Sequence, residues 1–123
     1  FLFFIFISSI AKLGFKNKVW KHLVVGKVRN QARLLGLYNA IGEERLMRLA
    51  SQVSPGDPKN IEAQAVQVYW ADLFGKDFRR NRNLAGINSL LNYGYAIIRS
   101  SMTSAVLSAG LHPTFGIFHK NRN

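Results

Sequence analysis

The carboxylate of Glu62 stands on a helical face that is otherwise apolar. Helical spacing places Glu62 on the same side of its segment as Ala65, Val66, Tyr69 and Leu73. A carboxylate in such surroundings is costly unless a positive group meets it, and a bound metal ion is one such group. Glu62 also falls in the first turn of its predicted helix, where the helix dipole favours an acid without any metal. The pattern supports both interpretations.

The chain has three histidines, of which His119 is the strongest candidate metal ligand. It follows the apolar tetrapeptide "FGIF", so a short apolar segment would hold its imidazole in a fixed place. Imidazole and carboxylate together suit Mg²⁺ or Mn²⁺, with water in the remaining positions. A structural histidine that bonds to its neighbours is the alternative. We expect His22 on a helix surface or half-buried, and His112 in the turn that follows Gly110.

Other common catalytic arrangements are not found in the sequence. There is no cysteine, which excludes disulfides, thiolate metal sites and zinc fingers. The serines of "RSSMTSAVLSAG" recur at helical spacing, which indicates small packing residues rather than a hydrolytic nucleophile. Asp72 and Asp77 flank a helix end and do not form a glycosidase pair. No glycine-rich phosphate loop of standard spacing is present.

Four apolar patterns of helical period must position these residues. They predict helices over residues 18–38, 42–53, 61–74 and 87–109. Strand signals are nearly absent after residue 18, so the expected fold class is all-α. Before the third helix, Asp57 can cap and Pro58 suits a first helical position, with Asn60 as an alternative cap. Gly110 and Pro113 end the fourth helix.

Two glycines fall inside the predicted helices. Gly26 weakens the first helix, and Gly94 in the fourth suggests close packing at that point. A length of 123 residues predicts one domain at most.

The charge balance is strongly basic. Seventeen lysines and arginines stand against six acids, which gives a net charge of +11 and a pI near 10.6. Such a field attracts polyanions, with nucleic acid as the first expectation and an anionic membrane surface as the second. Up to Arg33 every charged residue is basic, so the outer face of the first helix is positive and is either solvated or directed at DNA.

The chain begins with the apolar stretch "FLFFIFISSI". This run is shorter than the roughly 20 residues of a membrane span, and Lys12 follows it closely. A signal peptide fits poorly, because no basic region precedes the stretch. We expect a buried element, or a stretch outside the folded domain that misread or frameshifted DNA could encode.

Two longer motifs resemble the helical domain of the CRISPR-associated spacer integrases, the larger of the two proteins shared by most CRISPR adaptation systems. In "IEAQAVQVYWADLFGKDFRR", a Glu-x-x-Ala helix precedes Tyr-Trp and Leu-Phe. In "INSLLNYGYAIIRSSMTSAVLSAGLHPTFGIFH", an Asn-x-x-Leu-Asn-Tyr-Gly-Tyr helix leads to Gly-Leu-x-Pro-x-x-Gly-x-x-His. The resemblance is strong over residues 31–123 and is nearest to versions from single-effector, type II-like systems.

The resemblance implies a dimeric, metal-dependent DNA endonuclease and integrase that joins captured DNA into the CRISPR array. Its α-domain holds Mg²⁺ or Mn²⁺ through a Glu, a His and a later acid, and Glu62 and His119 match the first two. It implies a cytoplasmic, prokaryotic protein that assembles with the smaller adaptation protein and with DNA. The basic residues available for DNA backbone contacts are Lys76, Arg79, Arg80, Arg82, Arg99, Lys120 and Arg122.

The sequence departs from the family pattern in two respects. No acid follows His119, and in place of the family's N-terminal β-domain stands a segment, residues 1–17, that does not resemble the family. We therefore expect residues 18–123 to be a partial helical domain with weak metal affinity, little activity alone and an exposed apolar face. The alternatives are a non-catalytic basic fragment that binds DNA or docks on a partner, and a membrane-associated peptide with residues 1–10 as its foot.

Overall fold

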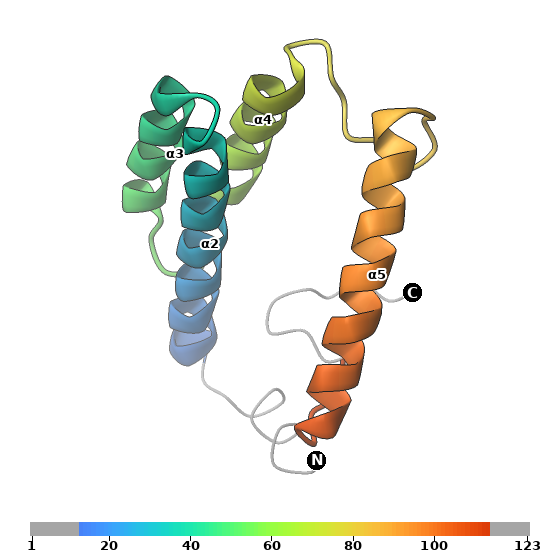
Figure 1. Ribbon diagram of the computed structural model, residues 1–123. Helices are drawn as coiled ribbons and strands as arrows, with labels where there is room; N and C mark the ends of the chain where they lie inside the picture. Colours follow the sequence, from blue (N-terminus) through green and yellow to red (C-terminus); the bar gives the residue numbers. More distant parts are fainter. Residues whose placement is uncertain (1–12, 114–123) are drawn as a thin grey trace. The chain divides into compact units, whose positions relative to one another are not determined.

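The computed structural model describes residues 13–113, which contain helices and no strand. Figure 1 shows the four helices, which are α2 (Leu13–Gly36), α3 (Ala40–Gln52), α4 (Ile61–Phe74) and α5 (Ile87–Ser108). The predicted all-α class is confirmed for this part of the chain. The bounds of α4 are those predicted, and α5 ends one residue before the predicted position.

The chain divides into two compact units where its length predicted one domain at most. The first is Lys12–Arg79 and contains α2, α3 and α4. The second contains, among the described residues, 80–113 with α5.

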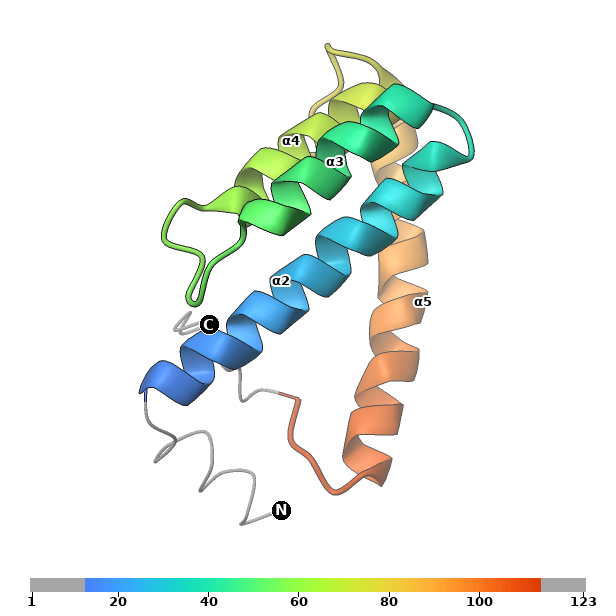
Figure 2. The same ribbon diagram turned by 90° about the vertical axis from the view of Figure 1, so that its left-hand side faces the viewer.

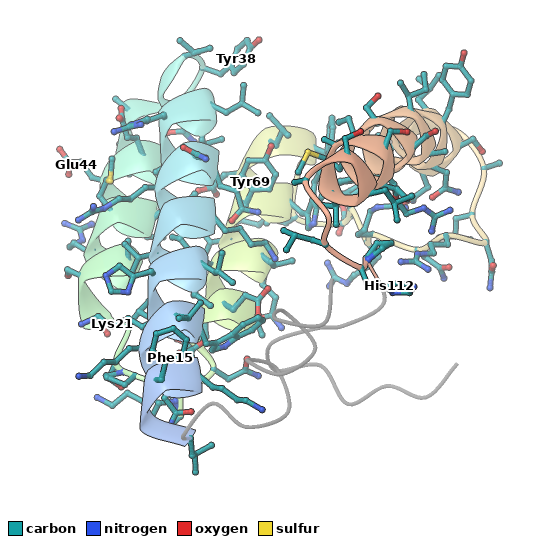
Figure 3. All side chains as sticks on the ribbon, turned by 90° about the horizontal axis from the view of Figure 1, so that it is seen from below. Phe15, Lys21, Tyr38, Glu44, Tyr69 and His112 are labelled. Carbon is teal, nitrogen blue, oxygen red and sulfur yellow. The ribbon has the colours of Figure 1, made fainter. Side chains whose placement is uncertain are left out.

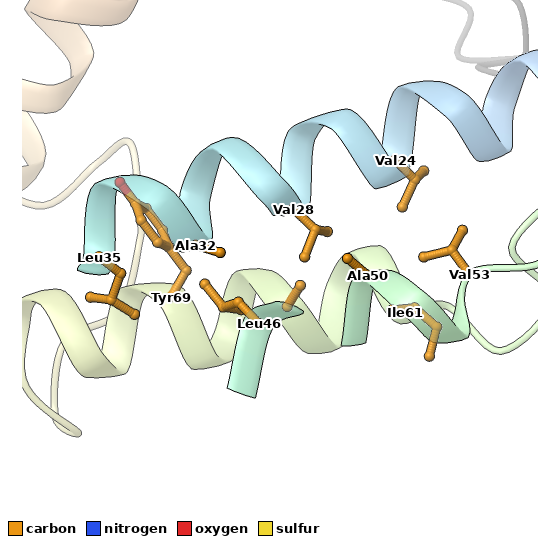
Figure 4. Close-up of a cluster of buried hydrophobic side chains, with 10 residues drawn as sticks. Val24, Val28, Ala32, Leu35, Leu46, Ala50, Val53, Ile61 and Tyr69 are labelled. Carbon is orange, nitrogen blue, oxygen red and sulfur yellow. The ribbon is translucent and has the colours of Figure 1, made fainter. Parts of the chain in front are cut away.

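The first unit is a three-helix bundle with one apolar core. Figure 2 shows α2, α3 and α4 side by side, and each of them contacts the other two. The core side chains recur every three or four residues along each helix, as one buried face requires. Ten of them form the cluster of Figure 4: Val24, Val28, Ala32, Leu35, Leu46, Ala50, Val53, Ile61, Ala65 and Tyr69.

The first helix is longer at its start than its apolar pattern predicted. It begins at Leu13 rather than residue 18, and it ends at Gly36 rather than residue 38. The additional turns carry Asn17, whose carbonyl accepts the amide of Gly56 in the α3–α4 loop at 3.0 Å. Leu13 and Phe15 in these turns are exposed, so they do not continue the buried apolar stripe from which the helix was predicted.

A short connection leads from α2 to α3. The amides of Tyr38 and Asn39 donate to the carbonyl of Leu35 at 2.9 and 2.7 Å. The side chain of Asn39 then caps α3 by accepting the amide of Gly42 at 3.0 Å. This cap starts α3 at Ala40, two residues before the predicted start.

Gly42 lies where three elements approach one another. A Cβ at this position would stand 2.5 Å from Cδ2 of Leu35 and 2.9 Å from Oδ2 of Asp72 on α4. Hydrogen is therefore the only side chain that fits without a shift of its neighbours.

Asp57 caps α4 from a buried position in the preceding loop. Its carboxylate accepts the amides of Ile61 at 2.8 Å and Glu62 at 2.9 Å. The cap that we predicted at Asp57 is confirmed, whereas the prediction for Pro58 is wrong because the helix begins three residues after it. Asn60 occupies the N-cap position, as the alternative predicted, with φ of 51°, but its side chain makes no cap bond.

In the second unit, α5 ends as the sequence predicted. Gly110 has φ of 74°, its amide donates to Leu107 at 2.9 Å, and the amide of Leu111 donates to Val106 at 3.0 Å. These two bonds are the Schellman motif, in which a left-handed glycine closes the helix. The close packing expected at Gly94 is not observed, since no described residue other than its own helix lies within 4 Å of the position of a Cβ there.

Gly26, in the middle of α2, is likewise exposed and in open space. Among the described residues nothing lies within 4 Å of the position of its Cβ, apart from the helix itself. A glycine inside a helix costs about 0.5–1 kcal/mol relative to alanine. Packing within the first unit does not account for this cost.

Candidate functional site

Glu62 lies at the start of α4, and its carboxylate is paired with a lysine. Nζ of Lys27, on α2, lies 2.6 Å from Oε1 of Glu62. The glutamate side chain is 26% exposed and that of the lysine 45%, so the pair sits at the edge of the bundle. The positive group expected beside Glu62 is thus the ammonium of Lys27, which lies 35 positions earlier in the same chain.

The apolar face next to Glu62 has the predicted members. Ala65 and Tyr69 are buried in the core, and Val66 and Leu73 are partly buried. Because this face packs into the bundle, the backbone of the first turn of α4 is fixed. Glu62 is therefore a positioned carboxylate at the edge of the bundle, and a carboxylate is a suitable oxygen ligand for Mg²⁺ or Mn²⁺.

The described residues do not complete a metal site around Glu62. No group of three His, Asp or Glu residues able to hold a metal ion occurs in residues 13–113. His119 lies outside the described residues, so its predicted partnership with Glu62 stays a prediction. Of the two predicted metal ligands, residues 13–113 thus contain Glu62, whose carboxylate is already paired with the ammonium group of Lys27.

The two other histidines have local roles. Nδ1 of His22 lies 2.8 Å from the carbonyl oxygen of Lys18, which can only accept, so Nδ1 carries the proton. His22 is exposed and His112 is half-buried in the turn after Gly110. These positions confirm what the sequence predicted for both.

A polar network in the second unit fixes the loop before α5. The guanidinium of Arg80 donates to Oδ1 of Asn88 at 3.1 Å and to Oδ1 of Asn92 at 2.8 Å. It also lies 5.5 Å from the ring centre of Tyr95. Asn88 Oδ1 accepts the amide of Asn81 at 2.9 Å, and Asn92 Nδ2 donates to the carbonyl of Arg82 at 2.9 Å. Asn88 is 5% exposed and is the buried residue of α5.

This network explains two asparagines to which the sequence analysis gave no role. Asn88 and Asn92 are the asparagines of the Asn-x-x-Leu-Asn-Tyr-Gly-Tyr motif, four residues apart and hence on one helix face. Their spacing was the available signal, but the sequence does not show that their partner is a loop arginine. The guanidinium of Arg80 is bound within the chain, and the DNA contact predicted for this residue stays a prediction.

The other basic residues predicted to contact DNA differ in whether their side chains have partners within the described chain. Arg79 donates to the carbonyls of Lys76 at 2.8 Å and Phe78 at 3.1 Å. Lys76, Arg82 and Arg99 are exposed, and within residues 13–113 their side chains form no ion pair. Lys120 and Arg122 lie outside the described residues.

Stacked aromatic rings hold the chain after α4. Trp70 stacks on Phe74 with ring centres 5.8 Å apart, and Phe78 lies 4.8 Å from Phe74. Tyr69 meets Trp70 edge-on at 4.9 Å. The loop that carries Lys76 is therefore anchored at Phe78.

Exposed apolar surface is extensive, as the sequence analysis expected. Phe15 and Tyr38, labelled in Figure 3, are 56% and 76% exposed at the two ends of α2. On α5 the exposed large apolar residues are Ile87, Leu90, Tyr93, Tyr95, Ile97, Ile98, Met102 and Leu107.

The serines of α5 are exposed rather than packed, so the packing role predicted for them is wrong. No helix within residues 13–113 has the length and apolar character needed to cross a membrane.

Comparison with known proteins gives one consistent result. The sequence profile of the family described as CRISPR associated protein Cas1 matches residues 11–123. The CRISPR-associated endonuclease Cas1 of Neisseria meningitidis serogroup C (strain 8013) is 40% identical over 107 residues, which cover 86% of this chain and 35% of that protein. The CRISPR-associated endonuclease Cas1 2 of Pyrobaculum aerophilum is 31% identical over 116 residues, which cover 88% of this chain and 39% of that protein.

The chain spans little more than a third of the length of these relatives. A similar share, 35%, holds for the CRISPR-associated endonuclease Cas1 1 of Saccharolobus solfataricus, which is 31% identical over 122 residues. The likeness therefore concerns one region of those proteins, and the described part of that region is helical.

Proposed function

The chain belongs to the CRISPR-associated Cas1 family, and on that premise we propose that it supplies part of a metal-dependent DNA endonuclease and integrase for CRISPR adaptation. The observation that carries the proposal is the family match over residues 11–123, which includes Glu62 and His119. The net charge of +11 supports a DNA substrate. We place this activity in the prokaryotic cytoplasm.

The proposed reaction is a phosphodiester transesterification. The 3′-hydroxyl of a captured duplex attacks a phosphorus of the CRISPR repeat, a new P–O bond forms, and the cut strand leaves with a free 3′-hydroxyl. We propose Glu62 and His119 as ligands of Mg²⁺ or Mn²⁺, which when bound stabilises negative charge on the phosphate and on the leaving oxygen. Lys76, Arg82 and Arg99 are the described residues that we assign to phosphate contacts.

The proposed partners follow from the family. They are a second copy of the chain, the smaller CRISPR adaptation protein and the two DNAs that are joined. The exposed apolar side chains of α5 and of the ends of α2 support a need for further protein contacts.

Direct metal binding is the sharpest test of the proposed ligands. Mn²⁺ binding is titrated by EPR with the wild-type chain, Glu62→Gln and His119→Ala. The matched controls are Glu44→Gln, on the exposed side of α3, and the exposed His22→Ala. We expect weak Mn²⁺ binding that falls about tenfold or more in the two ligand variants and is unchanged in the controls. Equal affinity in all five proteins would overturn the metal role.

Activity is measured on a labelled duplex that carries a CRISPR repeat. Since these 123 residues supply two of the three ligands that the family pattern implies, we expect no strand transfer or cleavage at a useful rate by this chain alone. Robust Mn²⁺-dependent nicking that disappears in Glu62→Ala would contradict this expectation of low activity and would support the assignment of Glu62.

A second function is favoured by the Lys27–Glu62 pair, because the pair neutralises the carboxylate without a metal. In this alternative the chain is a non-catalytic basic module that binds DNA or docks on a partner. DNA affinity that is the same in EDTA and in Mn²⁺, together with unchanged Mn²⁺ binding in Glu62→Gln, would favour it.

A further inference from the structure

Four basic residues and one glycine form a row along one exposed face of α2. Lys18, His22, Gly26, Arg29 and Arg33 follow one another in steps of four, four, three and four residues, which is the spacing of a single helix face. All five are exposed. With a rise of about 1.5 Å per residue, the row extends over roughly 22 Å. We call these five residues the α2 basic face.

The buried side of α2 fixes this face in place. Val24, Val28, Ala32 and Leu35 are buried against α3 and α4. The helix therefore cannot rotate about its axis without exposing its core residues. The backbone positions of the α2 basic face are therefore fixed relative to the bundle.

The charges of this face have no acidic partner in the described chain. The ion pairs of residues 13–113 join Lys27 to Glu62, Arg45 to Asp72 and Arg48 to Glu44. None of them includes Lys18, Arg29 or Arg33. The carboxylate of Glu43 lies beside Gly36, close to one turn beyond Arg33 along the helix.

Gly26 provides an independent observation in the middle of the row. It is a glycine in a helix interior, in open space, with no packing reason within the described chain. A glycine at such a point allows another backbone to approach closely. It leaves a gap between His22 and Arg29 on the face where the cations are. A ligand that runs along the row would meet the helix backbone there.

We propose that the α2 basic face binds the phosphate backbone of duplex DNA, with Gly26 as the point of closest approach. This inference rests on the proposed DNA substrate and extends it to a surface separate from Glu62. Three cations spread over about 22 Å fit a ligand that carries many charges along a strand, at about 3.4 Å per phosphate of helix axis. Contacts of this kind confer affinity and position rather than sequence choice.

The principal test compares two triple variants of equal charge. Lys18→Gln/Arg29→Gln/Arg33→Gln removes the cations of the face. Lys16→Gln/Arg48→Gln/Lys59→Gln removes three cations elsewhere in the same unit, and each variant lowers the net charge from +11 to +8. Binding to a labelled duplex of arbitrary sequence is measured by fluorescence anisotropy in EDTA over a range of KCl concentrations, after thermal melts confirm that both variants fold.

We expect the first triple to bind at least about tenfold more weakly near 0.1 M salt, and the control to change less than about threefold. The slope of log affinity against log salt should fall by about 2–3 in the first triple alone, at roughly 0.9 for each lost phosphate contact. Equal losses in the two triples would overturn the proposal, because net charge alone would then explain binding. If the first triple fails to fold, Arg33→Gln against Arg48→Gln provides the same comparison.

A single variant tests the role of Gly26. Gly26→Gln adds a neutral side chain in open space and replaces a poor helix former by a good one, so the melting temperature should not fall. We expect DNA affinity to decrease several-fold even so, because the side chain blocks close approach. Unchanged affinity in Gly26→Gln would overturn the close-approach role.

Two further measurements distinguish this proposal from the metal role of Glu62 and from binding to an anionic membrane. Glu62→Gln should bind duplex DNA as tightly as the wild type in EDTA, so loss of the metal role leaves this surface intact. Vesicles of phosphatidylserine and phosphatidylcholine test a membrane partner. If the first triple loses vesicle binding and keeps DNA affinity, the face binds anionic membranes and the DNA assignment is wrong.

Discussion

Nζ of Lys27 lies 2.6 Å from Oε1 of Glu62, so one cation already occupies the carboxylate that we propose as a metal ligand. The pair joins α2 to the first turn of α4, whose amides are capped by Asp57. An ammonium and a divalent ion at the same carboxylate repel each other. The presence of Lys27 therefore bears directly on how strongly this site can hold a metal.

Replacement of Lys27 should change metal binding and stability in opposite directions. We expect Lys27→Met to tighten Mn²⁺ binding several-fold, because the competing cation is removed, and to lower the free energy of unfolding by less than about 1 kcal/mol. Mn²⁺ EPR titration and thermal melts provide the two measurements. Lys59→Met, at an exposed loop position, is the control. Weaker Mn²⁺ binding in Lys27→Met would show that the lysine holds Glu62 in place rather than competing.

The cap at Asp57 should contribute substantially to the stability of the first unit. Asp57→Gly deletes one buried and one partly buried hydrogen bond and still tolerates the positive φ of 48° at this position. We expect the free energy of unfolding to fall by about 2 kcal/mol in denaturant titrations. Asn60→Gly, which removes a side chain without a cap bond at φ of 51°, should leave stability unchanged or slightly raised. Equal losses in the two variants would argue against the cap.

The network around Arg80 predicts a local effect on the loop. Asn88→Ala removes the acceptor of both the Arg80 guanidinium and the Asn81 amide. We expect faster hydrogen exchange at the Asn81 amide and a stability loss of about 1–3 kcal/mol in the second unit. Ser89→Ala, one position along on the exposed side of α5, should change neither quantity. An unchanged Asn81 exchange rate in Asn88→Ala would contradict the anchoring role.

Leu46 tests the core of the three-helix unit. It is 0% exposed within the cluster that joins α2, α3 and α4. Leu46→Ala should lower the free energy of unfolding by about 2–5 kcal/mol, measured by denaturant titration. Leu37→Ala removes the same atoms from a side chain that is 73% exposed and should have an effect within about 0.5 kcal/mol.

The sequence predicted what depends on neighbours along the chain and missed what depends on the packing of helices. The bounds of α4 and the Gly110 cap follow from local signals, and both are confirmed. The Lys27–Glu62 pair could not be predicted, because it requires the register between α2 and α4. The same limit applies to Arg80, since its charge suggested DNA and only the fold reveals its asparagine partners.

The closeness of Gly42 to Leu35 and Asp72 couples the shape of this bundle to its charge. Oδ2 of Asp72 also pairs with Arg45 at 3.4 Å. Any larger residue at position 42 has to displace both the fully buried side chain of Leu35 and the carboxylate of Asp72. The absence of a side chain at Gly42 therefore permits both the close approach of α2, α3 and α4 and the present position of the Asp72 carboxylate. A larger side chain at this residue would disturb the packing of the helices and the Arg45–Asp72 ion pair together.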